Sequence, residues 1–116
     1  MSENKLRAVI KGTGSALPAN RVSNAELAEK IDTSDEWITE RTGIKFRHIA
    51  SPEETTATLG ADAARNALAA ANMDASDIDL IVVATATPDN TFPASATKVQ
   101  HLLGAYGCVA FDVAAV

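Results

Sequence analysis

The chain has 116 residues, a length typical of one domain, and its composition of 47% hydrophobic and 22% charged residues is that of a folded globular protein. The net charge of −5, with no run of lysines and arginines to offset it, argues against nucleic-acid binding. The longest apolar stretch, around residues 78–86, is far shorter than the ~18 residues that span a membrane. No apolar segment follows the polar N-terminus, so the sequence predicts a cytoplasmic protein without a secretory signal.

The first elements predicted along the chain are short. Residues 7–11 have the apolar character of a strand. Ser23 and Glu26 have the spacing of a capping box, which predicts a helix that begins after Ser23. The same signature recurs at residues 33–36 and predicts a second helix, with Gly43 just past its end. Two short helices in succession indicate an irregular excursion rather than a core element.

The second half of the chain predicts alternating helices and strands. Apolar residues at helical spacing predict a helix over residues 56–71. The β-branched run at 78–84 predicts a strand covered on both faces, as in a parallel sheet. Pro93 suits the first position of a helix that ends at Gly104, and residues 108–116 predict a second buried strand. This order predicts right-handed crossovers and an α/β fold with a parallel or mixed sheet.

The end of the chain is unusual for a finished domain. C-termini are generally polar and exposed, whereas this one closes at Val116 on an apolar strand without a cap or charged tail. We therefore expect the chain to be incomplete.

Two glycines and two histidines give weak signals for chemistry. Gly12 and Gly14 follow a predicted strand as in a phosphate-binding loop, but the dinucleotide pattern needs a glycine where Leu17 stands. A tight turn is therefore favoured over nucleotide binding. His48 and His101 have no further ligand at suitable spacing, so no metal site is expected.

Cys108 is the only cysteine, so the chain has no intrachain disulfide. It stands at the start of an apolar strand, with no cation or helix N-terminus nearby to stabilise a thiolate. We expect a small buried side chain rather than a nucleophile.

Trp37 is the only tryptophan, and Arg41 follows it by four residues, so both project from one face of the second helix. A flat indole beside a guanidinium can bind a purine by stacking while the cation meets phosphate. The spacing alone instead favours a tryptophan packed under the helix with the arginine covering it.

Several longer blocks resemble β-ketoacyl-acyl carrier protein synthase III. They are Asp32–Ile38, Arg41–Ile44, Arg47-His48, Leu80–Thr85, Phe92-Pro93, Leu103-Gly104 and Gly107–Val113. The resemblance runs from about residue 10 to residue 116. It implies the thiolase-like α/β fold, in which two similar halves stack as five αβαβα layers in a homodimer. Residues 1–116 would be most of the first half, with the remainder absent.

The activity that this resemblance implies is a decarboxylative Claisen condensation. Acetyl-CoA, or another short acyl-CoA, would react with malonyl-acyl carrier protein to give 3-oxoacyl-acyl carrier protein and so initiate fatty-acid synthesis. The nucleophilic cysteine would come directly after Val116, with a histidine and an asparagine further downstream. This chain would then hold no catalytic residue, no metal and no permanently bound cofactor, and acyl-CoA would be a substrate.

The resemblance also implies roles for single residues. Trp37 matches the position that stacks on the adenine of coenzyme A, and Thr33 matches a neighbouring contact to the nucleotide. Arg41 matches the arginine at the phosphate end of the cofactor, with Thr42 close by. Phe92 matches a residue that reaches across the dimer and closes the partner's acyl pocket, and its bulk implies a short primer such as acetyl.

Two alternatives remain open. A related thiolase-fold synthase of secondary metabolism would share much of the pattern, although Trp37 favours the fatty-acid enzyme. The chain alone could also be a non-catalytic fragment or interaction module, against which the apolar terminus at Val116 counts.

Overall fold

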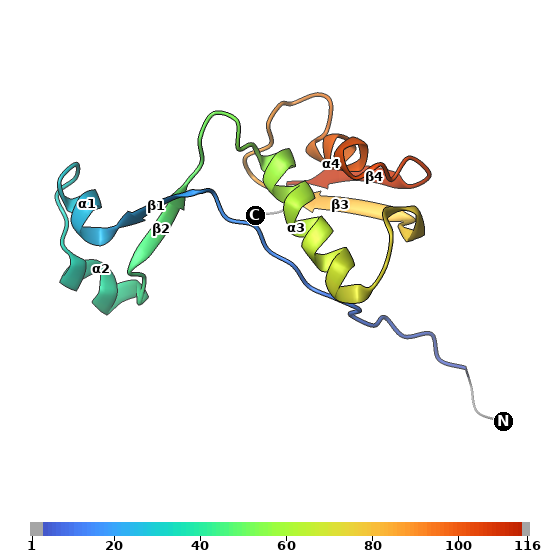
Figure 1. The fold of residues 1–116 in the computed structure, drawn as a ribbon, viewed down its shortest axis with the longest axis horizontal. Coiled ribbons are helices and arrows are strands. Elements are labelled where there is room, and N and C mark those ends of the chain that lie inside the picture. The colour runs from blue at the N-terminus through green and yellow to red at the C-terminus, as the bar shows by residue number, and fades with distance from the viewer. Residues whose placement is uncertain (1–3, 115–116) are drawn as a thin grey trace. The chain divides into compact units, whose positions relative to one another are not determined.

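The structure is a computed structural model that describes residues 4–114. The described residues form two compact units, one of residues 4–16 together with 56–114 and one of residues 17–55. Each unit contains its own two-stranded sheet (Figure 1).

The unit of residues 17–55 holds two short helices and an antiparallel strand pair. In chain order its elements are β1 (Asn20–Ser23), α1 (Asn24–Ala28), α2 (Asp35–Thr42) and β2 (Phe46–Ile49). Asn20 lies opposite Ile49, and Ser23 lies opposite Phe46. Both helices were predicted and neither strand was, because four residues are too few to show the alternation that marks a strand.

The helix ends in this unit follow local capping rules. The capping box is confirmed, since Ser23 Oγ accepts from the Glu26 N–H and the Glu26 carboxylate accepts from the Ser23 N–H. The second helix is capped by Ser34 rather than Thr33, because Ser34 is the extended residue whose hydroxyl reaches the open amides of the first turn. Gly43 ends α2 as predicted, with a left-handed φ of 71°.

The other unit alternates helix and strand. Its elements are α3 (Thr56–Ala71), the 3₁₀ turn η1 (Ala75–Asp77), β3 (Leu80–Ala84), α4 (Ser95–Leu103) and β4 (Val109–Val113). β3 and β4 pair in parallel, from Leu80 opposite Val109 to Ala84 opposite Val113. The predicted helix over 56–71 and the parallel strand pair are therefore confirmed. Residues 115–116, the end of the predicted second strand, lie outside the described residues.

The core of this unit lies between its two helices and one face of the sheet. Ala57 and Ala61 of α3 and Val99 of α4 are buried together, with Ile81 and Val83 of β3 packed against them. The other face exposes 45–63% of the side chains of Leu80, Val82, Val109 and Phe111. Within residues 4–114 the strands are thus covered on one face, whereas the sequence predicted cover on both.

Three further predictions are wrong. Residues 7–11 form no strand, because a strand needs a hydrogen-bonded partner and β3 pairs only with β4 among the described residues. Gly12 and Gly14 form no turn and have no positive φ. Pro93 is not the first helical residue, since α4 begins at Ser95.

Candidate functional site

Helix α2 carries Trp37 and Arg41, two of the predicted nucleotide contacts. Ile38 is only 5% exposed and anchors the helix to its unit, whereas the neighbouring Trp37 is 54% exposed. The cap at Ser34 fixes the turn that carries the indole, because its hydroxyl accepts the Trp37 N–H at 3.1 Å. The tryptophan is therefore not packed under the helix, as its spacing alone had favoured.

Arg41 lies over the indole of Trp37. The guanidinium carbon is 4.3 Å from the centre of the ring, within the range of a cation–π contact. The spacing of four residues thus brings the cation and the aromatic ring together, as predicted.

A hollow of about 370 Å³ opens beside the indole and is lined by Asp32, Thr33, Ser34 and Trp37. Its size lies at the lower end of small-molecule sites in proteins. The structure thus places Thr33 and Trp37 around one space. The arrangement offers an aromatic surface, a cation over that ring, and polar side chains just before the first turn of α2.

Thr42 and Phe92 are placed differently. The Thr42 hydroxyl donates to the Ile38 carbonyl at 2.7 Å and accepts from the Ile44 N–H at 3.1 Å, so it closes the end of α2. Phe92 belongs to the other unit, on the loop between β3 and α4, and is 85% exposed. Within the unit of residues 17–55, the structure therefore brings Thr33, Trp37 and Arg41 together.

A buried asparagine that sequence reasoning missed holds α2 in place. Asn24 is 2% exposed, and its side-chain amide donates to Asp35 Oδ1 at 2.8 Å and to the Ile44 carbonyl at 2.7 Å. Lys45 Nζ lies 3.0 Å from Asp35 Oδ2. The first turn of α2 is thereby bound to α1 and to the segment before β2. Asparagine side chains are mostly exposed in folded proteins, so no local pattern indicates the burial of Asn24.

Hydrogen bonding in this cluster stabilises the charged form of Asp35. The side-chain amide of Asn24, and after it the ammonium of Lys45, lower the pKa of Asp35 below its usual value of 3.8. A carboxylate whose pKa is lower in the folded state stabilises the fold above the unfolded pKa, and this contribution is lost as pH falls through the folded pKa.

We therefore expect Asp35→Asn to destabilise the protein at pH 7 and to have a progressively smaller effect as pH falls below 3.8, because the wild-type contribution is lost as pH falls through the lowered pKa of the folded state. Urea unfolding of the intact protein at several pH values measures the difference. Glu40→Gln, at an exposed position of the same helix, controls for the loss of one negative charge. A difference between wild type and Asp35→Asn that stays constant from pH 7 to pH 3 would contradict the role of the Asp35 charge.

The histidines and the cysteine have structural contacts. His48 Nδ1 lies 2.6 Å from the Pro18 carbonyl, and the His101 ring lies beside the Tyr106 ring. Cys108 is half-buried, and its thiol donates to the Ala105 carbonyl at 3.1 Å.

Within residues 4–114, no three histidine, cysteine or acidic side chains cluster as metal ligands. No helix in the described part of the chain is long and apolar enough to cross a membrane.

Comparison with curated proteins gives strong and extensive similarity. The chain is 79% identical over 110 residues to the β-ketoacyl-[acyl-carrier-protein] synthase III of Sphingopyxis alaskensis, a match that covers 95% of this chain and 34% of that protein. It is 67% identical over 110 residues to the Neisseria meningitidis protein of the same name, covering 94% of this chain and 34% of the relative. The chain thus spans about a third of the length of these relatives. No family model matches it.

Solved structures agree in fold. The 3-oxoacyl-[acyl-carrier-protein] synthase III of Aquifex aeolicus aligns with a TM-score of 0.85 at 50% identity, covering 91% of this chain and 34% of that chain. The priming β-ketosynthase of a polyketide biosynthetic pathway aligns with a TM-score of 0.86 at 42% identity, covering 91% and 32%. Both the resemblance seen in the motifs and the thiolase-like α/β fold are thereby confirmed. In sequence and in fold, this chain is similar to the N-terminal portion of β-ketoacyl-[acyl-carrier-protein] synthase III proteins.

Proposed function

We propose that the intact protein containing this chain condenses a short acyl-CoA, acetyl-CoA foremost, with malonyl-acyl carrier protein, and so initiates fatty-acid synthesis. The observation that carries the proposal is the 79% identity over 110 residues to a curated β-ketoacyl-[acyl-carrier-protein] synthase III. In this proposal the chain is most of the first half of a thiolase-like subunit, and the enzyme is a cytoplasmic homodimer. Acyl-CoA is a substrate, and no cofactor is permanently bound.

The hollow beside α2 is the proposed binding site for the nucleotide end of coenzyme A. The half-exposed indole of Trp37 offers a flat surface on which adenine can stack, which is favourable for any base. Arg41, held over that indole, supplies a positive charge for phosphate. Thr33 lines the same hollow and Thr42 closes the end of the helix, where each is proposed to contact the cofactor.

The chemical step is proposed to use residues beyond this chain. A cysteine expected directly after Val116 would attack the acyl thioester as a thiolate, forming an acyl-enzyme and releasing coenzyme A. Malonyl-acyl carrier protein would then lose carbon dioxide, and the resulting carbanion would attack the acyl group and displace the cysteine. A histidine and an asparagine further along would promote decarboxylation. The contribution proposed for this chain is binding of acyl-CoA and, through Phe92, closure of the partner's acyl pocket.

An assay of the purified intact protein tests the proposal. With acetyl-CoA and malonyl-acyl carrier protein we expect 3-oxobutanoyl-acyl carrier protein by mass spectrometry, with one coenzyme A and one carbon dioxide released per product. Replacing acetyl-CoA with acetyl-acyl carrier protein should strongly reduce product, because the proposed site recognises the nucleotide. Equal turnover of both donors would argue against recognition of coenzyme A. Absence of product with both donors would overturn the proposed function.

A second candidate is a priming synthase of secondary metabolism. It is favoured by the similarity to the polyketide-pathway synthase, with a TM-score of 0.86 at 42% identity. The two functions differ in the acceptor they use. Preferential turnover with a polyketide acyl carrier protein over the fatty-acid carrier of the same organism would favour this alternative.

A further inference from the structure

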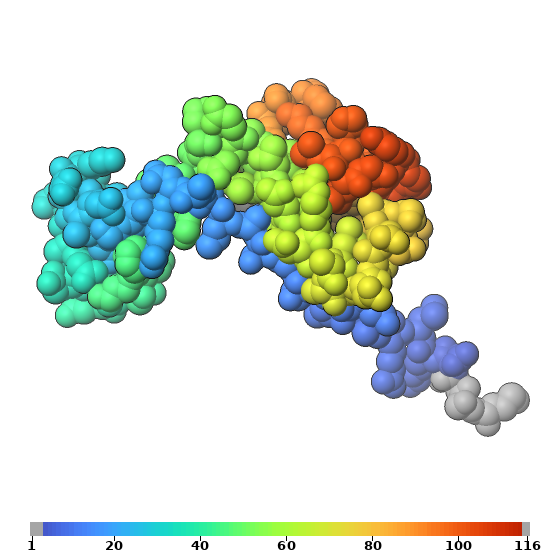
Figure 2. Space-filling model, in the orientation of Figure 1, coloured from blue at the N-terminus to red at the C-terminus, as the bar shows by residue number. Residues whose placement is uncertain are grey.

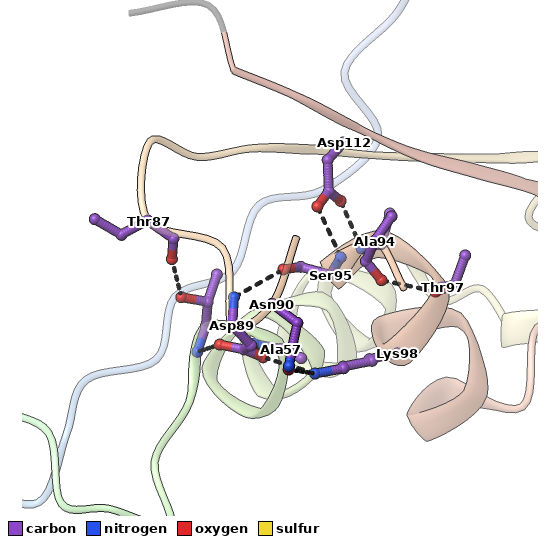
Figure 3. A network of polar contacts seen from close by, with 11 residues as sticks. Ala57, Thr87, Asp89, Asn90, Ala94, Ser95, Thr97, Lys98 and Asp112 are labelled. Atoms are coloured by element: carbon purple, nitrogen blue, oxygen red, sulfur yellow. Dashed lines mark hydrogen bonds and ion pairs between the residues drawn. The ribbon is translucent and has the colours of Figure 1, made fainter. Parts of the chain in front are cut away.

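Asp89 ties the loop of residues 85–94, which connects β3 to α4, to the first turn of α3 (Figure 3). Its Oδ1 accepts from the Thr56 N–H at 2.8 Å, and its Oδ2 accepts from the Ala57 N–H at 3.0 Å. The first amides of a helix have no partner within the helix, so a carboxylate at this position makes two charge-assisted hydrogen bonds. The aspartate therefore caps α3 from more than 30 residues away.

The same residue connects the loop to α4. The Asp89 N–H donates to the hydroxyl of Ser95, which is fully buried at the start of α4. The Ser95 N–H donates in turn to Asp112 Oδ2 of β4 at 2.7 Å. Lys98 Nζ lies 4.0 Å from Asp89 Oδ2. Asp89 thus joins the first turns of both helices that cover the sheet.

Two further contacts hold the loop on either side of Asp89. The Thr56 hydroxyl donates to the Thr87 carbonyl at 2.9 Å, and Lys98 Nζ donates to Asn90 Oδ1 at 3.0 Å. Phe92 follows on the same loop and is 85% exposed. A ring so exposed gains little from packing within its own unit, so its place is set by the loop backbone that carries it.

We infer that Asp89 is a positioning residue that fixes Phe92 and thereby sets the length of acyl chain the enzyme accepts. The inference rests on the proposed function, in which Phe92 closes the acyl pocket of the partner subunit. Without the Asp89 carboxylate, two amides of α3 lose their acceptor, and only the bond from the Thr56 hydroxyl to the Thr87 carbonyl still links the loop to that helix. The ring then no longer stands at one depth in the pocket, and longer chains are admitted.

The test compares kcat/KM of the intact protein for acetyl-CoA and for hexanoyl-CoA. Asp89→Ala is expected to lower the ratio of kcat/KM for acetyl-CoA to kcat/KM for hexanoyl-CoA by about tenfold. This is the scale on which a pocket discriminates between hydrocarbon chains of different length. Asp89→Asn keeps one acceptor oxygen, so it should give an intermediate ratio, and it replaces the alanine variant if that fails to fold. Ala61→Gly, which weakens the buried part of α3 away from the loop, should lower stability and leave the ratio unchanged.

A double-mutant cycle shows whether Asp89 acts through Phe92. Phe92→Ala should itself lower the ratio, and the variant carrying both Asp89→Ala and Phe92→Ala should have the ratio of Phe92→Ala alone. Additive effects, or a wild-type ratio in the Asp89 variants, would overturn the inference while the proposed function stands. A wild-type enzyme that makes no product would overturn the proposed function instead.

Hydrogen exchange of residues 85–94, measured in the same proteins, should be faster in Asp89→Ala, and unchanged exchange would show that Asp89 does not hold the loop.

Discussion

Replacing Trp37 with alanine in the intact protein is expected to raise the KM for acetyl-CoA strongly while leaving kcat nearly unchanged. Stacking of a base on an aromatic side chain is worth about 1–3 kcal/mol, so the expected rise is roughly 5- to 150-fold. The indole lies in the hollow proposed for the nucleotide, and adenine takes no part in the reaction. An interaction that is equal in the ground state and the transition state affects KM and not kcat.

Two variants make the measurement specific. Trp37→Phe keeps a smaller aromatic ring and should raise KM less than alanine does. Tyr106→Ala removes another exposed aromatic side chain, in the unit that does not contain α2, and should leave the KM for acetyl-CoA unchanged. If Trp37→Ala has the wild-type KM, the indole does not bind the nucleotide. If kcat falls instead, Trp37 acts on the reaction or on the fold.

Those parts of the fold with local causes could be predicted from the sequence. The capping box at Ser23 and the left-handed glycines Gly43 and Gly104 mark helix ends through residues adjacent in the chain. The β-branched run that forms β3 likewise carries its own signal. In the candidate site, the spacing of Trp37 and Arg41 predicted their contact because residues four apart on a helix face the same way.

Features that depend on distant residues could not be predicted. The start of α4 was placed at Pro93, but the helix begins at Ser95, where Asp112 accepts the N–H groups of Ser95 and Ala96 at 2.7 Å. Asp89 caps α3 in the same way, from outside any local pattern. An aspartate that follows or lies within a strand has no sequence signal that it will cap a helix elsewhere. For the same reason, the burial of Asn24 became visible only in the structure.

Gly12 and Gly14 were singled out in the sequence, but the structural role predicted for them is wrong. The sequence favoured a tight turn, but neither glycine has a positive φ. Instead, the segment of residues 12–15 lies against α3, beside the green surface of that helix in Figure 2. A Cβ at Gly12 would lie 2.7 Å from the Ala67 carbonyl oxygen, closer than real Cβ contacts. The glycines are needed because the two backbones lie close together.

Gly14→Ala is accordingly expected to be the most destabilising single substitution in this segment. Its Cβ would overlap the Ala67 backbone nitrogen and the Ala63 carbonyl oxygen, and would lie 2.8 Å from the Asn66 carbonyl carbon. All three atoms belong to the backbone of α3, so no side chain can move aside. Overpacking typically costs about 1–3 kcal/mol, and we expect a loss of about 3 kcal/mol or more here because the helix itself must shift.

The melting temperature of the intact protein measures this loss, and Gly107→Ala is the matched control. No atom lies within 4 Å of a Cβ at Gly107, and its φ is not positive, so the change there should be within about 0.5 kcal/mol. Asn66 Nδ2 also holds the segment by donating to the Ser15 carbonyl at 2.9 Å, a bond that displacement of the segment would break. If Gly14→Ala melts at the same temperature as Gly107→Ala, the segment is not held against α3 in solution. The glycine would then owe its place to some other constraint.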